Sequence, residues 1–369
     1  MPAWAAWSPE AAEAPWTVGI EEEVMLVSPG DWLPASRCED VLAVLPETVA
    51  ECARAETHGS ALELGTAPHA TVGEGARQLA SLRSVLVATL DGLGLRAAGS
   101  GTHPTARWEH IAVTPGARYQ FVHASMRELA RREPTFGLHV HVAVPDPEAA
   151  LRALNGIREH LPVLLALSGN SPFWQGRDSG LASARTPAFQ AFPRTGPPRR
   201  FRDYADYVEA IDVLVRCDAI PEPTFLWWDA RLQPRFGTVE VRVMDAQTRV
   251  EDTTAIAALV QCLVRLEASR EPGGAEAPEV LSENRFIAAR DGMEARLVDR
   301  SSWSRRPVRD RLAELLELCA PHARAVGCVE GLADVGRLAA SPGAARQRAL
   351  ADRVESLEGL VAALSDAFT

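Results

Sequence analysis

Three segments of the 369-residue chain alternate between apolar and charged side chains, and this period of two constrains the fold most strongly. They are TVGIEEEVMLVS (17–28), TFGLHVHVAVP (135–145) and RFGTVEVRVMD (235–245). Such alternation predicts strands with one apolar and one polar face. The longer segments between them are typical of helices, and they do not follow a regular βαβ order. We therefore expect an α+β fold, in which an antiparallel sheet with a concave polar face is backed by helices.

One predicted helix has a clear apolar stripe. Residues 73–92 carry leucines at helical spacing, namely Leu79, Leu82, Leu86 and Leu90. Leucines at these intervals share one face of a helix.

The chain divides into three expected regions. Residues 1–15 are expected to form a loose leader, residues 16–300 the main domain, and residues 301–369 a helical part packed on that same domain. Within the main domain, residues 168–200 are rich in Gly, Pro, Ser and Arg. Long segments of this kind are usually binding loops or lids. We expect this one to cover a functional site, with arginines such as Arg185 available to gate an anionic ligand.

Local signals predict where helices begin and break. The helix that contains Pro162 is expected to break there, because proline lacks the backbone N–H and clashes with the preceding turn. A helix over 252–268 is expected to begin at Asp252 or Thr253, whose side chains can cap free N–H groups. The stretch 269–279 is expected to be an exposed connection.

The charged residues exclude several classes of function. Asp and Glu outnumber Lys and Arg by 49 to 38, which gives a formal net charge of −11 and disfavours nucleic acid as a partner. The chain contains no lysine, so it has neither a P-loop nor a pyridoxal-phosphate Schiff base. A nucleoside triphosphate would have to be bound through metal ions and arginines.

Cysteine usage and hydropathy indicate a cellular location. The six cysteines are scattered without a CxxC pair, which favours reduced thiols in a cytoplasmic protein. No apolar run approaches the roughly 20 residues that span a bilayer, so we expect a soluble protein without a membrane partner.

Three consecutive glutamates lie in the first predicted strand. Residues two apart in a strand share a face and lie roughly 6.5 Å apart. Glu21 and Glu23 therefore point together, while Glu22 points the other way with Ile20 and Val24. Two carboxylates on one face are costly unless a cation meets them. The alternative is a solvated edge strand.

The same pattern recurs in other strands. His139 and His141 share a face in GLHVHV, Glu240 and Arg242 share one in TVEVRV, and Glu63 projects from ALELG. Satisfied histidines and a cross-strand ion pair would explain each case separately. In one sheet, however, these strands would form a bowl lined by Glu21, Glu23, Glu63, His139, Glu240 and Arg242. Carboxylates with one imidazole suit Mg²⁺ or Mn²⁺, and Arg242 could stabilise a transferred phosphoryl group.

Seven ordered motifs carry a resemblance to a known family. GIEEE, GSGTHP, GLHVHV, ALSGNSPFWQGRDSGLASAR, FPRTGPP, WWDAR and GTVEVRVMD resemble the type 2 glutamate–cysteine ligases, also called carboxylate–amine ligases. The resemblance covers roughly residues 18–267. The family looks related to glutamine synthetase and the guanidino kinases in its catalytic sheet. The resemblance implies an ATP- and Mg²⁺- (or Mn²⁺-) dependent ligase, in which residues 16–300 form the catalytic domain. It would join a carboxylate to an amine through an acyl phosphate, with glutamate and cysteine as small-molecule substrates.

The resemblance also implies roles for individual residues. Metal ligands are implied at Glu21, Glu23, Glu63, His139 and Glu240. Arg242 and Glu240 would be catalytic, with Arg242 on the transferred phosphate. Arg194, His141 and Arg231 would contact ATP or substrate, and a homodimer is implied. Two positions depart from the family pattern: Gly59 replaces a common Gln, and Leu232 replaces a common Pro.

Three other functions fit the same residues. A metal-dependent hydrolase could use the His-x-His pair, although zinc sites usually contain more His and fewer Glu. An amino-acid kinase could transfer phosphate on this scaffold without ligation. A catalytically silent binding protein would keep the fold alone.

Overall fold

The computed structural model describes residues 1–131, 134–271 and 276–368. Its centre is a seven-stranded sheet in the order β10-β11-β5-β1-β3-β2, with β4 paired to the C-terminal end of β1. Every pairing in this sheet is antiparallel, which confirms the expected fold class. The strands are β1 (Val18–Val27), β2 (Ala53–Ala55), β3 (Ala61–Gly65), β4 (Arg96–Ala98), β5 (Gly137–Ala143), β10 (Ala230–Gln233) and β11 (Thr238–Asp245).

The strand register places polar side chains of neighbouring strands opposite one another. Glu21 of β1 pairs with His139 of β5, and Glu23 of β1 pairs with Glu63 of β3. Further along the sheet, His141 of β5 faces Glu240 of β11. Because every second side chain lies on the same face, these residues line one polar face, as the alternation predicts.

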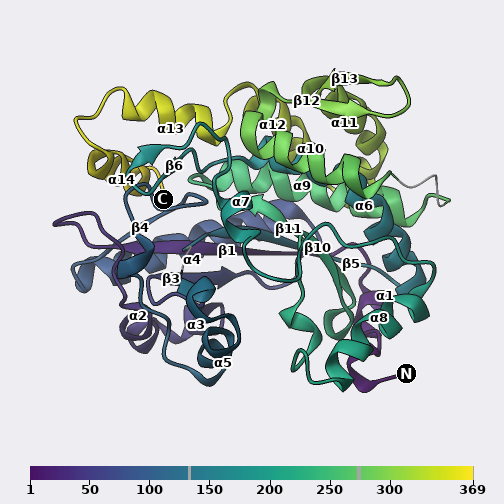
Figure 1. Cartoon of the computed structure of the whole chain (residues 1–369), viewed down its shortest axis with the longest axis horizontal. Coiled ribbons are helices and arrows are strands. Elements are labelled where there is room, and N and C mark those ends of the chain that lie inside the picture. Colours follow the sequence, from purple (N-terminus) through teal and green to yellow (C-terminus); the bar gives the residue numbers. More distant parts are fainter. Residues whose placement is uncertain (132–133, 272–275, 369) are drawn as a thin grey trace.

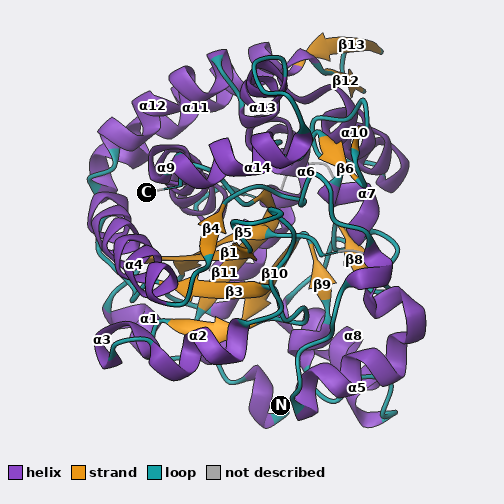
Figure 2. Ribbon diagram, turned by 90° about the vertical axis from the view of Figure 1, so that its left-hand side faces the viewer, coloured by secondary structure: helices purple, strands orange, loops and turns teal. Residues whose placement is uncertain are grey.

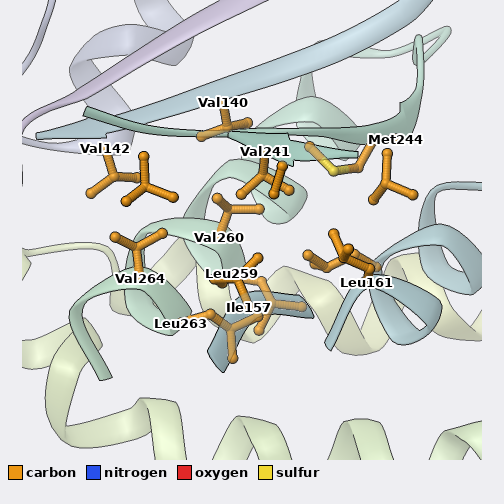
Figure 3. Close-up of a cluster of buried hydrophobic side chains, with 14 of the residues drawn as sticks. Val140, Val142, Ile157, Leu161, Val241, Met244, Leu259, Val260, Leu263 and Val264 are labelled. Carbon is orange, nitrogen blue, oxygen red and sulfur yellow. The ribbon is translucent and has the colours of Figure 1, made fainter. Parts of the chain in front are cut away.

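The opposite face of the sheet is apolar and packs on two long helices, α6 (Pro147–Ser168) and α9 (Val250–Ala268). Figure 1 shows the sheet across the middle of the molecule, with α6, α9 and the C-terminal helices on one side of it. In the close-up of Figure 3, Val140 and Val241 point from the sheet toward side chains of these helices, among them Leu263. Burial of these apolar side chains is the main favourable contribution that holds the sheet against α6 and α9.

Helix α4 (Val72–Gly92) packs beside the sheet (Figure 2). It begins with a capping box, in which Glu74 N–H donates to Thr71 Oγ1 at 3.3 Å and Thr71 N–H donates to Glu74 Oε2 at 3.1 Å. The expected stripe is confirmed, because all four of its leucines are buried.

A buried ion pair links α4 to the first strand. Arg83 Nε donates to Glu22 Oε1 at 2.7 Å, and Arg83 Nη2 donates to Glu22 Oε2 at 2.6 Å. The other donors of the guanidinium bind backbone oxygens of Gln247, Thr248 and Phe368 at 2.8–3.0 Å. Glu22 thus points away from its two neighbours, as predicted, and its partner lies 61 positions further along the chain.

Two predictions about helices are wrong. Helix α6 does not break at Pro162 but continues to Ser168. Its surroundings hold it in place, since Pro162 and most of the following turn are fully buried, and packing outweighs the lost hydrogen bond. Helix α9 begins at Val250, so neither Asp252 nor Thr253 is its N-cap. Asp252 instead binds two arginines of the C-terminal helices, Arg337 at 3.0 Å and Arg346.

The expected loose leader is also wrong, because residues 1–15 pack against the main domain. They form a 3₁₀ turn, η1 (Ala3–Ala5), and a short helix, α1 (Glu10–Glu13). Ala5 is fully buried, and Trp7 Nε1 donates to the backbone oxygen of Val144 at 2.9 Å. Contacts of the partly buried Trp4 and Trp7 and of the buried Ala5 hold this segment despite its prolines.

The tail is mainly helical, and side chains from Val308 to Ala339 belong to the same apolar cluster as Val241. The expected connection at 269–279 lies partly outside the described residues, at 272–275. The segment 168–200 contains short elements instead of an open loop. The remaining helices and strands are α2 (Cys38–Val44), α3 (Glu47–Ala50), α5 (Ala117–Met126), α7 (Arg185–Phe189), α8 (Tyr204–Arg216), α10 (Pro278–Asp291), α11 (Val308–Val326), α12 (Val329–Ala340), α13 (Gly343–Ala351), α14 (Leu357–Asp366), β6 (Phe173–Trp174), β7 (Arg177–Asp178), β8 (Thr195–Gly196), β9 (Trp227–Trp228), β12 (Arg296–Asp299) and β13 (Ser304–Pro307).

Candidate active site

A cavity of about 760 Å³ lies over the polar face of the sheet. Strands β1, β3, β5, β10 and β11 form its floor. The walls come from η1, β2, α5, α7 and the segments 56–58, 222–227 and 234–236. Of the residues predicted for the site, the cavity lining includes Glu21, Glu23, Glu63, His139, His141, Arg231, Glu240 and Arg242. The strands therefore bring together the polar residues that the alternation placed on one face.

Two groups of potential metal ligands share one glutamate. Ligand atoms of Glu21, Glu63 and His139 lie within 4.8 Å of one another, and so do those of Glu21, His141 and Glu240. Glu21 Oε2 lies 3.6 Å from His139 Nδ1 and 3.4 Å from His141 Nε2. Glu21 therefore stands between two adjacent positions that a cation could occupy.

Glu23 lies at the edge of the first group. Its Oε2 accepts a hydrogen bond from Gly137 N–H at 2.6 Å, and its Oε1 lies 3.8 Å from His139 Nε2. Burial and the nearby Glu56 carboxylate raise the pKa of Glu23 to about 7, against the opposing effect of Arg185. The carboxylate is thus short of positive charge in this arrangement.

Glu240 is held by three side chains. Arg231 donates to both its oxygens, at 2.6 and 3.1 Å, and Gln233 Nε2 donates to Oε2 at 2.8 Å. Arg242 donates to Oε1 and also to His139 Nδ1, the latter at 3.3 Å. Burial alone would raise the pKa of Glu240, but Arg231 and Arg242 outweigh it and hold the pKa well below its usual range. Glu240 is therefore a fixed carboxylate, oriented by both arginines.

The acidic groups on the β3 side of the cavity lack such partners. Burial raises the pKa of Glu63 well above its usual range, and the charges on Glu21, Glu56 and Glu23 add to this effect. Burial likewise raises the pKa of Glu56. Arg54 approaches Glu63 only to 3.9 Å and is largely exposed. A cation placed here would relieve this mutual repulsion.

Each of the two histidines has one ring nitrogen that makes no hydrogen bond in the described part of the chain. Burial, and then the charge on Arg242, lowers the pKa of His139 to about 3, so its imidazole is neutral near pH 7. Among the described residues, neither His139 Nε2 nor His141 Nε2 has a hydrogen-bond partner, although both atoms are buried. The charges on Glu21 and Glu240 outweigh burial and raise the pKa of His141, whereas His139 is a neutral imidazole whose unbonded nitrogen can serve as a metal ligand.

Exposed arginines surround the mouth of this acidic cavity. Arg54, Arg118 and Arg235 line it from β2, α5 and η5 (Pro234–Phe236). Arg118 bridges to Glu222 on the opposite wall at 2.7 Å, a contact that is about half exposed. Cations at the mouth attract phosphates, whereas the floor would repel them without metal ions.

One predicted site residue lies elsewhere. Arg194 is not part of the described cavity lining. Its Nε donates to the backbone oxygen of Phe225 at 3.0 Å, and its guanidinium stacks on the ring of Trp227, which does line the cavity. Trp227 therefore separates Arg194 from the cavity, and the backbone of Arg194 is left-handed, with φ of 61°.

The sequence does not mark Glu56 as a site residue, and it names Arg185 only as one of the arginines that could gate an anionic ligand. Glu56 follows β2 in a loop, so no alternation marks its face. Arg185 is one of several arginines in 168–200, and only the structure separates it from them by placing it in the cavity. No pattern in the sequence distinguishes Arg185 from Arg194.

The fold belongs to a class with solved members. The crystal structure of a glutamate–cysteine ligase from Francisella tularensis in complex with AMP matches 95% of this chain and 88% of its own, with a TM-score of 0.67 at 14% identity. At this identity the match shows the fold alone. This chain therefore shares the fold of that solved ligase.

Sequence comparison identifies the family. Glutamate-cysteine ligase family 2 matches residues 17–367. Two relatives from Rubrobacter xylanophilus are named "Putative glutamate--cysteine ligase 2-1" and "Putative glutamate--cysteine ligase 2-3". They are 39% and 41% identical, covering 95% and 96% of this chain and 94% and 98% of their own lengths. The chain belongs to glutamate-cysteine ligase family 2, and membership confirms the expected class, an ATP-dependent ligase that forms an amide bond.

Membrane spans require helices that are both long and apolar. Among the described residues, no helix meets both conditions for crossing a bilayer.

Proposed function

We propose that this protein joins glutamate to cysteine through an amide bond, using ATP and Mg²⁺ or Mn²⁺. The two substrates are those in the names of its relatives. The single observation that carries the proposal is the convergence of three strands on Glu21, which belongs to both groups of metal-ligand atoms. A site with two adjacent cation positions beneath a mouth lined with arginines fits a triphosphate.

The residues fit hard divalent cations. Carboxylate oxygens with one or two imidazole nitrogens suit Mg²⁺ and Mn²⁺, and the unpaired nitrogens of His139 and His141 leave donor atoms unused. Such ions, when bound, would neutralise the negative charge of the floor and of a triphosphate. The proposed ligands are Glu21, Glu23, Glu63, His139 and Glu240.

The chain's own residues would then orient and stabilise the reacting groups. Arg242 lies between the two ligand groups, bonded to His139 and Glu240, where it can contact the transferred phosphoryl group. Arg231 holds Glu240 from the other side and keeps its carboxylate in one orientation. Preorganised charges of this kind are the main contribution a protein makes to phosphoryl transfer.

The proposed reaction has two steps. The γ-carboxylate of glutamate attacks the γ-phosphorus of ATP, so that a carboxyl–phosphate bond forms while the bond to ADP breaks. The unprotonated amine of cysteine then attacks the acyl carbon, the bond from that carbon to phosphate breaks, and the nitrogen loses a proton to the departing phosphate. Water must be kept from the acyl phosphate between the steps, and the segment 168–200, which contributes α7 to the wall, is the proposed cover.

An ADP-release assay with Mg²⁺ over a panel of amino acids tests the function. We expect ADP only when a carboxylate and an amine are both present, with the glutamate and cysteine pair preferred. Glu240→Ala should abolish release without unfolding the protein, whereas Glu251→Ala, at an exposed glutamate of α9, should not change it. ATP consumption with a carboxylate alone would indicate a kinase, and hydrolysis of amides without ATP a hydrolase. No turnover with any pair would contradict the proposal.

Two further properties are part of the proposal. We propose that the protein is cytoplasmic and forms a homodimer. Sedimentation equilibrium should give about twice the mass of the chain, 39.8 kDa, and a single-chain mass would contradict the dimer.

A further inference from the structure

Arg185 reaches the cavity from a tethered part of the segment 168–200. Its backbone N–H donates to Ser171 Oγ at 3.2 Å. Ser171 Oγ in turn donates to Asp245 Oδ2 at 2.6 Å, and Ser183 Oγ donates to Asp245 Oδ1 at 2.8 Å. Asp245 is fully buried at the end of β11. It therefore ties two serines of the segment to the sheet and fixes the position at which α7 begins.

The guanidinium of Arg185 is buried without a carboxylate partner. The residue is 5% exposed, and no carboxylate oxygen of the described residues lies within 4.0 Å of its nitrogens. It donates only to the backbone oxygens of Val243 at 3.4 Å and Arg242 at 3.3 Å, and its buried Nε–H has no acceptor there. By contrast, Arg231 and Arg242, the other arginines deep in the cavity, both bind Glu240.

A glycine makes room for this cation beside the proposed ligands. A Cβ at Gly137 would lie 2.5 Å from Arg185 Nη2 and 2.9 Å from His139 Nε2. Gly137 N–H donates to Glu23 Oε2 at 2.6 Å. Guanidinium, imidazole and carboxylate therefore meet around one backbone position, at the edge of the first ligand group.

We propose that Arg185 binds an oxyanion of the reaction, namely the carboxylate that is activated or the phosphoryl group transferred to it. The proposal rests on the proposed function. A buried, unpaired cation costs stability, and that cost is offset when an anion arrives. Carboxylate and phosphate both fit the planar fork of a guanidinium with two parallel hydrogen bonds. Arg185 therefore supplies the positive charge that an anionic acceptor needs to approach a wall of glutamates.

The test compares variants of two arginines in the same segment. Arg185→Gln removes the charge, and Arg177→Gln is the matched control, because Arg177 lies exposed on β7. Calorimetry measures the binding of glutamate, of a non-hydrolysable ATP analogue with Mg²⁺, and of inorganic phosphate with Mg²⁺. We expect Arg185→Gln to weaken one of these ligands about 10- to 100-fold, the loss typical of a charged hydrogen bond. The control should stay within about twofold of wild type.

The pattern of losses identifies the anion. Weakened glutamate binding with unchanged binding of the analogue assigns Arg185 to the carboxylate, and the reverse pattern, with loss of phosphate binding, assigns it to the phosphoryl group. Binding within about twofold of the control for all three ligands overturns the proposal, as does a wild-type protein that binds none of them. Without ligand, the melting temperature of Arg185→Gln should stay close to that of wild type or exceed it, because the charge serves the ligand and not the fold.

A second variant guards against misfolding, and the assays separate the two proposals. If Arg185→Gln does not fold, Arg185→Lys keeps the charge but loses the fork, and we expect at least about tenfold weaker binding than in Arg177→Lys. Equal binding in these two variants also overturns the proposal.

A wild-type protein that binds glutamate through Arg185 but consumes no ATP with any amine would refute the proposed function and leave this role intact.

Discussion

The buried pair of Arg83 and Glu22 permits a prediction with a definite size. All five N–H donors of the guanidinium are used, two on Glu22 and three on backbone oxygens. Arg83→Met would leave a carboxylate that is 1% exposed without its cation. Breaking a buried pair in this way costs about 3–5 kcal/mol. With an unfolding entropy of roughly 2.1 cal/mol/K per residue, a chain of 369 residues should melt about 4–6 °C lower.

Denaturant unfolding followed by circular dichroism measures this loss, and a double variant tests its cause. Replacing both partners, as Arg83→Met with Glu22→Leu, removes the orphaned charge and should recover at least about 2 kcal/mol of the loss. Arg77→Met, at an exposed arginine of the same helix, is the control and should stay within about 0.5 kcal/mol of wild type. A single variant that loses less than about 1 kcal/mol, or a double variant no more stable than the single, would refute the reasoning.

Three further predictions follow from the site and its surroundings. Gly137→Ala should lower kcat by about 100-fold with the fold retained, because the new methyl group displaces Arg185 and His139; activity near wild type would show that neither side chain needs its present position. Chelation of divalent ions should stop ADP release, and Mg²⁺ alone should raise the melting temperature by relieving repulsion among the carboxylates; a melting temperature insensitive to Mg²⁺ would contradict the metal site. His103 is buried, its Nε2 donates to Trp32 O at 2.9 Å while its Nδ1 accepts two backbone N–H groups, and burial lowers its pKa to about 4. As the pH falls, His103 therefore takes up a proton in the unfolded chain near pH 6.5, before it does so in the folded protein. Its contribution to the free energy of unfolding is complete above pH 6.5 and decreases toward pH 4, by at most about 1.4 kcal/mol per pH unit. In urea unfolding, the stability difference between wild type and His103→Asn should narrow over that range, and a constant difference would refute the assignment.

Much of the site could be predicted because strands have a fixed period. The side chains of a strand alternate strictly, so the order of residues in β1 is enough to assign Glu21 and Glu23 to one face and Glu22 to the other. The same reasoning places His139 and Glu240 on polar faces. The order of the strands in the sheet depends on tertiary contacts and cannot be derived from any one strand. Each polar strand face needs polar neighbours, however, and these neighbours are available when the strands join one sheet.

Other features depend on contacts that no local pattern records. Pro162 signals a break, yet packing on both sides of α6 keeps the helix continuous. Arg194 and Arg185 lie nine positions apart in one irregular segment. The hydrogen bonds of Asp245 fix the chain beside Arg185, whereas Arg194 is held by Phe225 and Trp227. Glu56 lies in a loop, where side-chain direction follows from the turn and not from a period.

Strand β1 carries acidic side chains on both of its faces, and this has a consequence for how the sheet can assemble. A slip of one residue would exchange the faces, driving Glu21 and Glu23 into the apolar layer and turning Glu22 away from the only guanidinium placed to receive it among the described residues. In the shifted register, the carboxylates of Glu21 and Glu23 would be buried without cations, and the carboxylate of Glu22 would lose its partner Arg83. The residues of β1 that are proposed to serve catalysis therefore also favour the correct register of that strand over a register shifted by one residue.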